Sequence, residues 1–139
     1  MTKGQYIRTT EHRSLMNVHR GYFDIDGKQV FFRSTWEANI ALYLNFLIKQ
    51  GEILRWEYEP KSFLFEKIRS GTRTYRPDFQ VFKKDGTDEF WEIKGWMDPK
   101  SATKIKRMRI YFPEVKLIVI DGDSYKDIRN KIGKLLKFY

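Results

Sequence analysis

Two carboxylates and one ammonium group occur at a spacing that suits hydrolysis of a phosphodiester bond. Asp78 follows Pro77, 13 residues separate it from Glu92, and Lys94 follows Glu92 after one intervening residue. Paired carboxylates are typical ligands of Mg²⁺, which keeps open positions for waters and substrate phosphates. A bound divalent ion polarises a phosphate and lowers the pKa of a coordinated water from about 15.7 toward 7. Lys94 could orient the attacking water or stabilise developing charge.

The stretch around these residues predicts a β-hairpin, and the length of its loop decides whether the two acids meet. A two-residue turn would set Asp78 opposite Ile93, on the wrong face of the sheet. A three-residue loop over 84–86, with Gly86 in the left-handed conformation, sets Asp78 opposite Glu92 instead. We predict the three-residue loop.

Side chains alternate between the faces of a strand, which gathers the charges of residues 75–94 on one face. Glu92 and Lys94 share that face, while Trp91 and Ile93 take the other. The first strand of the hairpin should likewise separate an apolar row, Tyr75, Pro77, Phe79 and Val81, from a polar row, Arg76, Asp78 and Gln80.

The predicted pairing would bring two negative charges close together. Directly opposed strand residues have Cβ atoms about 5 Å apart, so Asp78 and Glu92 would repel each other unless a cation lay between them. Mg²⁺ suits such oxygen ligands. The backbone carbonyl of Ile93 is a natural further ligand, and Glu37 could complete a first or second metal site.

Glu37 has two interpretations. Ser34 and Glu37 match the Ser-x-x-Glu capping box at the start of a helix predicted over 34–49. Glu37 also heads an apolar stripe that continues to Ile48. A carboxylate in that position could cap the helix or point over the edge of the core toward a site, and the sequence leaves both roles open.

A second helix is predicted directly after the strand that carries Glu92. It spans about 98–111, with Asp98 as N-cap and Pro99 at the first helical position. Its basic residues are well placed to grip phosphates. Its expected apolar positions are Ala102, Ile105, Met108 and Tyr111. The residues we expect to contact DNA are Arg33, Arg73, Arg76, Lys100, Lys104, Lys106 and Arg107.

The remaining strands follow from turn signals and apolar runs. A first hairpin is predicted over 22–32 with its turn at Asp26-Gly27. Strands over 53–59 and 62–67 should be separated by Pro60. The most apolar run, 115–121, predicts a central strand covered on both faces. Glu57 and Glu59 are extra acids near the predicted site, for which solvated strand faces are the favoured interpretation. Glu66, Asp88 and Glu89 are interpreted as surface residues.

The last predicted element is an amphipathic helix over 124–136, capped by Asp123 or Ser124. The alternation of hairpin, helix, strands, helix, strand and helix predicts an α/β fold with one mixed central β-sheet flanked by helices. The positions expected to face inward on the last helix are Ile128, Ile132, Leu135 and Leu136.

Length and composition indicate one folded domain with a polyanionic partner. The chain has 139 residues, of which 41% are hydrophobic, and a formal net charge of +9, which favours nucleic acid. The lack of cysteine excludes disulfides and thiolate zinc sites. No apolar run approaches the roughly 20 residues of a membrane span. We expect residues 1–20 to form a basic arm, flexible or exchanged in a dimer, and residues 21–139 to form the nuclease domain.

Several motifs resemble a known nuclease superfamily. Pro77-Asp78 and Glu92-Ile93-Lys94 look like the PD-(D/E)xK motif of restriction-endonuclease-like nucleases. Within that superfamily the chain resembles the phage endonuclease I-type Holliday junction resolvases. The resemblance runs in matching order over about residues 31–120, through Phe32-Arg-Ser-Thr-Trp-Glu37, Trp56-Glu-Tyr-Glu59, Thr74-Tyr-Arg-Pro-Asp-Phe79 and Glu92-Ile-Lys-Gly95.

The resemblance implies a restriction-endonuclease-like core and a metal-dependent, structure-selective DNA endonuclease. The active-site positions of that family fall on Glu37, Asp78, Glu92 and Lys94. The resemblance also implies dependence on Mg²⁺ or Mn²⁺ and a homodimer that cuts two symmetry-related strands of a four-way junction during DNA recombination. Such an enzyme would act on branched double-stranded DNA in the cytoplasm of a bacterial or phage-infected cell, with no membrane partner.

Two other functions fit the same residues. Another PD-(D/E)xK nuclease, either restriction-type or a transposon-end-cleaving subunit, would share the helix carboxylate and the strand site, but it usually needs an added specificity element. A non-catalytic DNA-binding module would carry the same basic residues, with its carboxylates in structural roles. Metal-dependent cleavage of DNA distinguishes the nucleases from the binding module.

Overall fold

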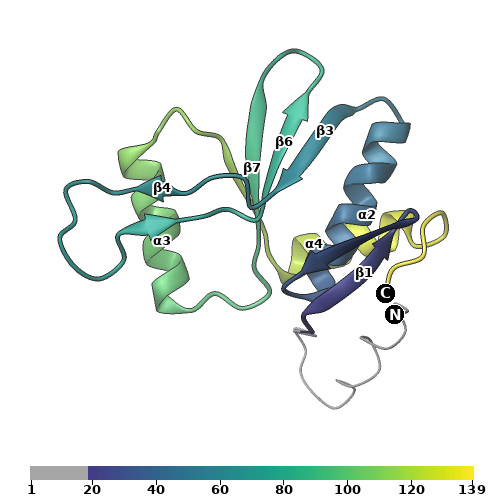
Figure 1. Cartoon of the computed structure of the whole chain (residues 1–139), viewed down its shortest axis with the longest axis horizontal. Helices are drawn as coiled ribbons and strands as arrows, with labels where there is room; N and C mark the ends of the chain where they lie inside the picture. The colour runs from purple at the N-terminus through teal and green to yellow at the C-terminus, as the bar shows by residue number, and fades with distance from the viewer. Residues whose placement is uncertain (1–18) are drawn as a thin grey trace. The chain divides into compact units, whose positions relative to one another are not determined.

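Residues 19–139 are described by a computed structural model, and they fall into two units (Figure 1). The first unit comprises the described residues up to Gly51 together with Asp123–Tyr139, and the second comprises Glu52–Gly122. Most of the predicted basic arm, residues 1–18, lies outside the described residues. No helix within residues 19–139 is both long and apolar enough to cross a membrane.

The first unit begins with the predicted hairpin. Strand β1 (Gly21–Ile25) pairs antiparallel with β2 (Lys28–Phe32). The turn residues Asp26 and Gly27 have φ values of 51° and 93°. Two left-handed residues give the turn a twist that matches the twist of the flanking strands. The position of the turn is therefore confirmed.

Helix α2 (Thr35–Lys49) follows the hairpin, and its start is confirmed. The Ser34 Oγ accepts a hydrogen bond from the Glu37 N–H at 3.1 Å, as an N-cap side chain does. Its apolar stripe is buried as predicted, because Ala41 and Leu44 are both fully shielded from solvent.

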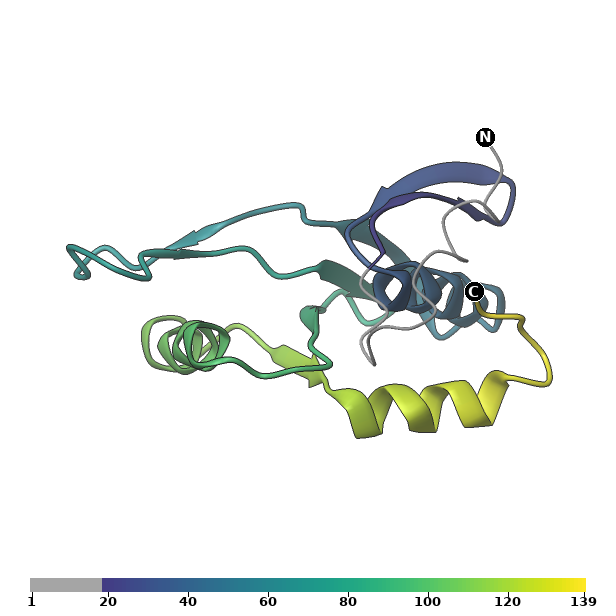
Figure 2. The same ribbon diagram turned by 90° about the horizontal axis from the view of Figure 1, so that it is seen from below.

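Helix α4 (Gly122–Ile132) contacts α2 through aromatic and polar groups. In Figure 2, α2 lies between the β1–β2 hairpin and α4. The rings of Trp36 and Tyr125 stack with centroids 4.0 Å apart, and the Asn39 amide donates to the Tyr125 hydroxyl at 2.7 Å. Burial raises the pKa of Tyr125 to about 12, so this hydroxyl stays protonated at neutral pH.

The last helix differs from the prediction at both ends. It begins at Gly122, so Asp123 and Ser124 lie inside its first turn and neither precedes it as a cap. It ends just before Gly133, where a Cβ would lie 2.7 Å from the Arg129 carbonyl oxygen, so the space at this position suits a residue without a Cβ. Of the predicted inward positions, Ile132 is buried and Ile128 and Leu136 are half-buried, but Leu135 is 72% exposed.

A four-stranded sheet with the order β3-β6-β7-β8 organises the second unit. Strands β3 (Ile53–Tyr58), β6 (Phe79–Lys83) and β7 (Asp88–Ile93) are antiparallel, and β8 (Leu117–Ile120) runs parallel to β7. The α/β class with a mixed sheet is confirmed. The prediction of a central strand over 115–121 is wrong, because β8 is an edge strand of this sheet. An apolar run indicates that both faces of a strand are covered. It does not indicate whether the strand has one neighbouring strand or two.

A two-stranded ribbon and one helix cover part of one face of the sheet. Strand β4 (Phe63–Leu64) pairs antiparallel with β5 (Thr74–Tyr75), and α3 (Pro99–Tyr111) lies beside this ribbon (Figures 1 and 2). The ribbon, the helix and the sheet share a hydrophobic cluster formed by Phe63, Phe65, Tyr75, Phe90, Met108 and Leu117.

This ribbon corrects two predictions. The strand predicted over 62–67 is only two residues long. Tyr75 belongs to the ribbon and not to the first strand of the central hairpin, because Pro77 lacks an N–H group and interrupts the ladder between them. Of the apolar positions predicted on α3, Met108 is buried and Ile105 is half-buried, while Ala102 and Tyr111 are exposed.

Candidate active site

The central hairpin β6–β7 has the predicted loop and register. The Lys83 N–H donates to the Thr87 carbonyl at 2.8 Å, which leaves three residues in the loop, and Gly86 has a φ of 91°. The strands pair from Phe82 with Asp88 to Phe79 with Trp91. Asp78 lies in a bend directly before β6, and its carboxylate accepts from the N–H of Ile93, the residue after Glu92 at the end of β7. The three-residue loop is confirmed.

Asp78 is held firmly by its neighbours on both sides. Its Oδ2 accepts a hydrogen bond from the Ile93 N–H at 2.7 Å, and its carbonyl accepts one from the Glu59 N–H at 2.7 Å. The side chain is buried, with 8% of the residue exposed. A carboxylate has two oxygens with about four lone-pair positions, so an acceptor of one amide hydrogen bond can also ligate a metal. The Ile93 backbone adjoins this carboxylate directly.

Glu92 is held by a tyrosine that the sequence placed on the opposite face. The Tyr75 hydroxyl donates to Glu92 Oε1 at 2.7 Å, and Tyr75 is buried in the hydrophobic cluster. The prediction that Tyr75 lies in an apolar row away from the acids is therefore wrong. Burial and the nearby negative charge of Glu92 raise the pKa of Tyr75 well above its usual value, so the hydroxyl remains a donor at all ordinary pH values.

The face of β7 that carries Glu92 is partly covered by apolar side chains, whereas the sequence predicts a polar face. Phe90 alternates with Glu92 along β7 and lies on the same face, where its ring packs edge-to-face against Phe63 with centroids 5.3 Å apart. Glu92 is half-buried. The carboxylate therefore stands at the border of an apolar cluster rather than on an open polar face.

Lys94 follows the end of β7 and is linked to the start of α3. Its N–H donates to the Ile120 carbonyl at 2.9 Å, and its Nζ lies 3.9 Å from Asp98 Oδ2. Asp98 is the predicted N-cap, and its Oδ1 accepts from the Ser101 N–H at 2.7 Å. That hydrogen bond holds the pKa of the Asp98 carboxyl below its usual value. The helix start is confirmed.

The Glu37 side chain bonds at the start of α2, but to the residue before the N-cap Ser34, whose own N–H the capping box would use. Its Oε1 accepts a hydrogen bond from the Arg33 N–H at 3.1 Å, and it belongs to the first unit. Within residues 19–139, no group of three or more His, Cys, Asp or Glu side chains could hold a metal ion. The pair that the structure brings together is Asp78 and Glu92, and the catalytic role of Glu37 stays a prediction.

Two residues for which the sequence predicts other roles adjoin the acidic pair. Tyr75 is predicted to lie in an apolar row. Glu59 is interpreted as part of a solvated strand face, but its N–H binds the Asp78 carbonyl and its φ is 46°, which is uncommon for a residue other than glycine. The Glu59 Oε1 lies 3.9 Å from an Arg76 nitrogen. Glu89, predicted to be a surface residue, is buried, and its Oε1 accepts from the Trp91 indole N–H at 3.0 Å.

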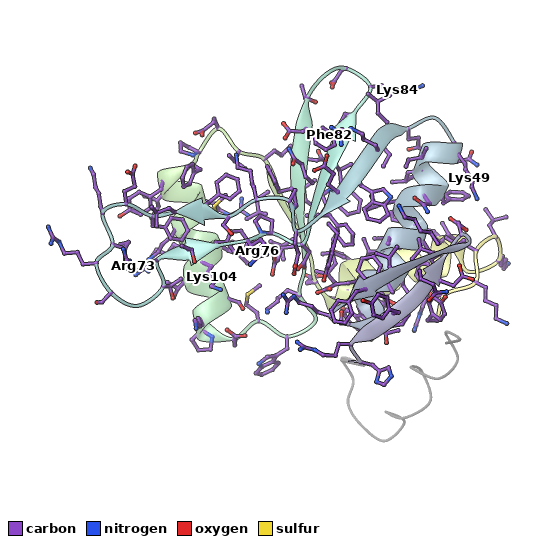
Figure 3. The ribbon with its side chains drawn as sticks, in the orientation of Figure 1. Lys49, Arg73, Arg76, Phe82, Lys84 and Lys104 are labelled. Carbon is purple, nitrogen blue, oxygen red and sulfur yellow. The ribbon has the colours of Figure 1, made fainter. Side chains whose placement is uncertain are left out.

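The predicted DNA-binding residues lie in different surroundings. Arg33 belongs to the first unit, and the Arg76 guanidinium is paired with the Glu59 carboxylate. The Arg107 guanidinium donates to the Thr72 carbonyl and so links α3 to the loop between β4 and β5. In Figure 3, Arg73, Lys104 and Arg76 come from that loop, from α3 and from the segment before β6. Arg73, Lys100 and Lys106 are exposed, and Lys104 is half-buried.

Comparison with known protein families gives a match over most of the chain. The family described as "Protein of unknown function (DUF1064)" matches residues 22–127, which is most of the chain and includes Asp78, Glu92 and Lys94. No curated protein and no solved structure matches the chain at a significant level.

Proposed function

This chain belongs to the DUF1064 family of proteins of unknown function, and we propose that it is a metal-dependent, structure-selective DNA endonuclease. The proposed substrate is branched double-stranded DNA, above all the four-way junction. The proposed reaction is hydrolysis of one phosphodiester bond in each of two symmetry-related strands. The observation that carries the proposal is the pair of carboxylates Asp78 and Glu92. Asp78 binds the N–H of Ile93, the residue next to Glu92, and Glu92 is bound by the Tyr75 hydroxyl.

The donor set of this pair fits a hard divalent cation. Asp78 and Glu92 supply carboxylate oxygens, and the backbone of Ile93, whose N–H already binds Asp78, supplies a carbonyl between Glu92 and Lys94. Oxygen ligands of this kind favour Mg²⁺ or Mn²⁺ over softer metals. When bound, the cation supplies a Lewis acid at the scissile phosphate.

The protein groups around the pair have distinct roles in this proposal. The Ile93 N–H and the Tyr75 hydroxyl fix the orientations of Asp78 and Glu92, as partners of metal ligands commonly do. The Lys94 ammonium group orients the attacking water or stabilises charge on the phosphate. Water adds to phosphorus, the bond to the leaving sugar oxygen breaks, and that oxygen takes up a proton.

Selection of branched DNA and a dimeric state belong to the same proposal. A junction offers two symmetry-related strands, and a two-fold homodimer would present two identical sites to them. The many Lys and Arg residues of the chain favour recognition through the phosphate backbone. We also propose that the β6–β7 hairpin with the parallel strand β8 is a restriction-endonuclease-like core, which is the part of the fold that the motif resemblance implies.

Cleavage of synthetic DNA tests the proposed function. The full chain would be incubated with a four-way junction and, separately, with a linear duplex of the same sequence, each with Mg²⁺ or with EDTA. We expect paired cuts in the junction with Mg²⁺, little cutting of the duplex, and none in EDTA. Equal cutting of both substrates would reject structure selectivity, and cutting that persists in EDTA would reject metal dependence.

Replacing Tyr75 by phenylalanine tests whether the tyrosine orients Glu92. The aromatic ring remains in the cluster, but the hydrogen bond at 2.7 Å to Glu92 Oε1 is lost. We expect the affinity for Mn²⁺ to fall about 10-fold or more, measured by isothermal titration calorimetry. The matched control is Tyr111→Phe, an exposed tyrosine on α3, which should leave the affinity unchanged. Equal affinities in the two variants would remove Tyr75 from the site.

A further inference from the structure

The loop between β4 and β5 and helix α3 form one strongly basic surface, which we call the loop–helix surface and define as residues 66–73 and 99–111. The chain has 27 Lys and Arg residues and 18 acids, and this surface holds eight of the former and one of the latter, Glu66. Its net charge of +7 compares with +9 for the whole chain. Most of the excess positive charge is therefore concentrated in 21 residues of one unit.

The loop is anchored to the rest of the unit at its base. Phe65, just before the loop, is fully buried, and its N–H donates to the Arg73 carbonyl at 2.8 Å. The Arg107 guanidinium of α3 donates to the Thr72 carbonyl. The cations of the loop are thus presented on a supported segment, which lowers the entropy cost of ordering them on a ligand.

The loop cations differ from those of the sheet in their partners. On the sheet, Arg55 pairs with Glu57, and Lys83 and Lys116 both approach Glu89. Within the described residues, no ion pair or side-chain hydrogen bond engages Lys67, Arg69 or Arg73. These three line an open hollow of about 600 Å³ together with Glu66 and Ile68. A polyanion would meet positive charge there that the protein itself does not neutralise.

The β4–β5 ribbon connects the loop that lines this hollow to the acidic pair. Tyr75, whose hydroxyl binds Glu92, is the last residue of β5. A strand advances about 3.3 Å per residue, so Arg73 lies about 7 Å, and Arg69 at most about 20 Å, from Tyr75 along the chain. Successive base pairs of a duplex are about 3.4 Å apart. Lys67 lies at most about 26 Å from Tyr75 on the same reckoning, so all three loop cations lie within about one turn of a duplex, roughly 34 Å, of Tyr75.

We infer that the loop–helix surface binds the phosphate backbone of one duplex arm of the DNA, within about one helical turn of the bond that is cut. This inference rests on the proposed function and adds to it the place where an intact arm is held. Contacts of this kind fix the position and direction of a duplex without reading its sequence. An enzyme that selects branched DNA needs such a contact with a duplex arm, because the directions of the arms define the geometry of the branch.

Binding measurements in EDTA test the inference without cleavage. The triple variant Lys67→Ala, Arg69→Ala, Arg73→Ala and the wild-type chain would be titrated against a fluorescent four-way junction at several salt concentrations. We expect at least a 10-fold loss of affinity near physiological salt, and a slope of log affinity against log salt that is smaller by about 2 to 3.

The matched control is a second triple variant, which removes the same charge from exposed positions of α4: Lys126→Ala, Arg129→Ala, Lys131→Ala. This control should bind the junction within about twofold of wild type. Equal losses in the two triple variants would mean a general charge effect and would overturn the inference, as would unchanged binding by the loop variant. Thermal melting checks that both variants fold, and glutamate at the same three loop positions should weaken binding further.

Phosphate ethylation locates the contact on the DNA. Ethylation should interfere with wild-type binding within about ten nucleotides of the cut, roughly one duplex turn, and interference confined elsewhere would also overturn the inference. A wild-type chain that binds junctions through the loop but never cuts them would contradict the proposed endonuclease and leave the DNA contact supported.

Discussion

Replacing Asp78 by asparagine, or Glu92 by glutamine, should lower the rate of junction cleavage at least 100-fold. Each change keeps the size of the side chain but removes the negative charge that a divalent cation requires. A 100-fold loss corresponds to about 2.7 kcal/mol of transition-state stabilisation. DNA affinity measured in EDTA should stay near the wild-type value, because the proposed role of the two acids is in cleavage and not in binding of the backbone.

Glu57→Gln is the matched control for these variants. Glu57 lies on the same sheet, on β3, and is exposed and paired with Arg55, so its neutralisation should leave the cleavage rate within about twofold. If either Asp78→Asn or Glu92→Gln retained more than a tenth of the wild-type rate, equivalent to a loss below about 1.4 kcal/mol, the assignment of the site would be wrong.

Phe65→Ala should produce the largest loss of stability of any change near the ribbon. Phe65 is fully buried in the hydrophobic cluster, and its ring contacts Tyr111 and Phe112 with centroid distances of 5.8 and 6.3 Å. Removing a buried phenylalanine ring costs about 3–5 kcal/mol, through lost burial and the cavity that remains. Urea denaturation followed by circular dichroism would measure the free energy of unfolding.

The neighbouring residue provides the control for this change. Leu64 precedes Phe65 and is 48% exposed, so Leu64→Ala should cost well under about 1 kcal/mol. A similar cost for the two substitutions would show that the ribbon is not anchored by Phe65. It would also remove the support that the loop–helix surface needs at its base.

The central hairpin could be predicted from local sequence because local rules determine it. Gly86 can adopt the left-handed conformation that a three-residue loop requires, and strict alternation then decides which side chains share a face. The caps of α2 and α3 were predictable for the same reason, since Ser34 and Asp98 bond to amides three residues away.

The parts that sequence reasoning missed depend on pairing between distant segments. Tyr75 and Glu92 are 17 residues apart, and nothing in the alternation around Tyr75 indicates that Pro77 separates it from β6 and redirects its hydroxyl toward the acid. The edge position of β8 likewise depends on the order of strands in the sheet. The burial of Glu89 depends on an indole partner two residues away and on lysines from β6 and from the segment before β8.

The central claim is that Asp78 and Glu92 hold one divalent cation between them. Anomalous X-ray diffraction from crystals of the chain soaked in Mn²⁺ tests it most directly, because the manganese signal locates the ion independently of any assumed role. We expect a manganese peak coordinated by oxygens of both carboxylates. A peak coordinated by neither of them, or a structure in which the two acids point to opposite faces of the sheet, would contradict the claim.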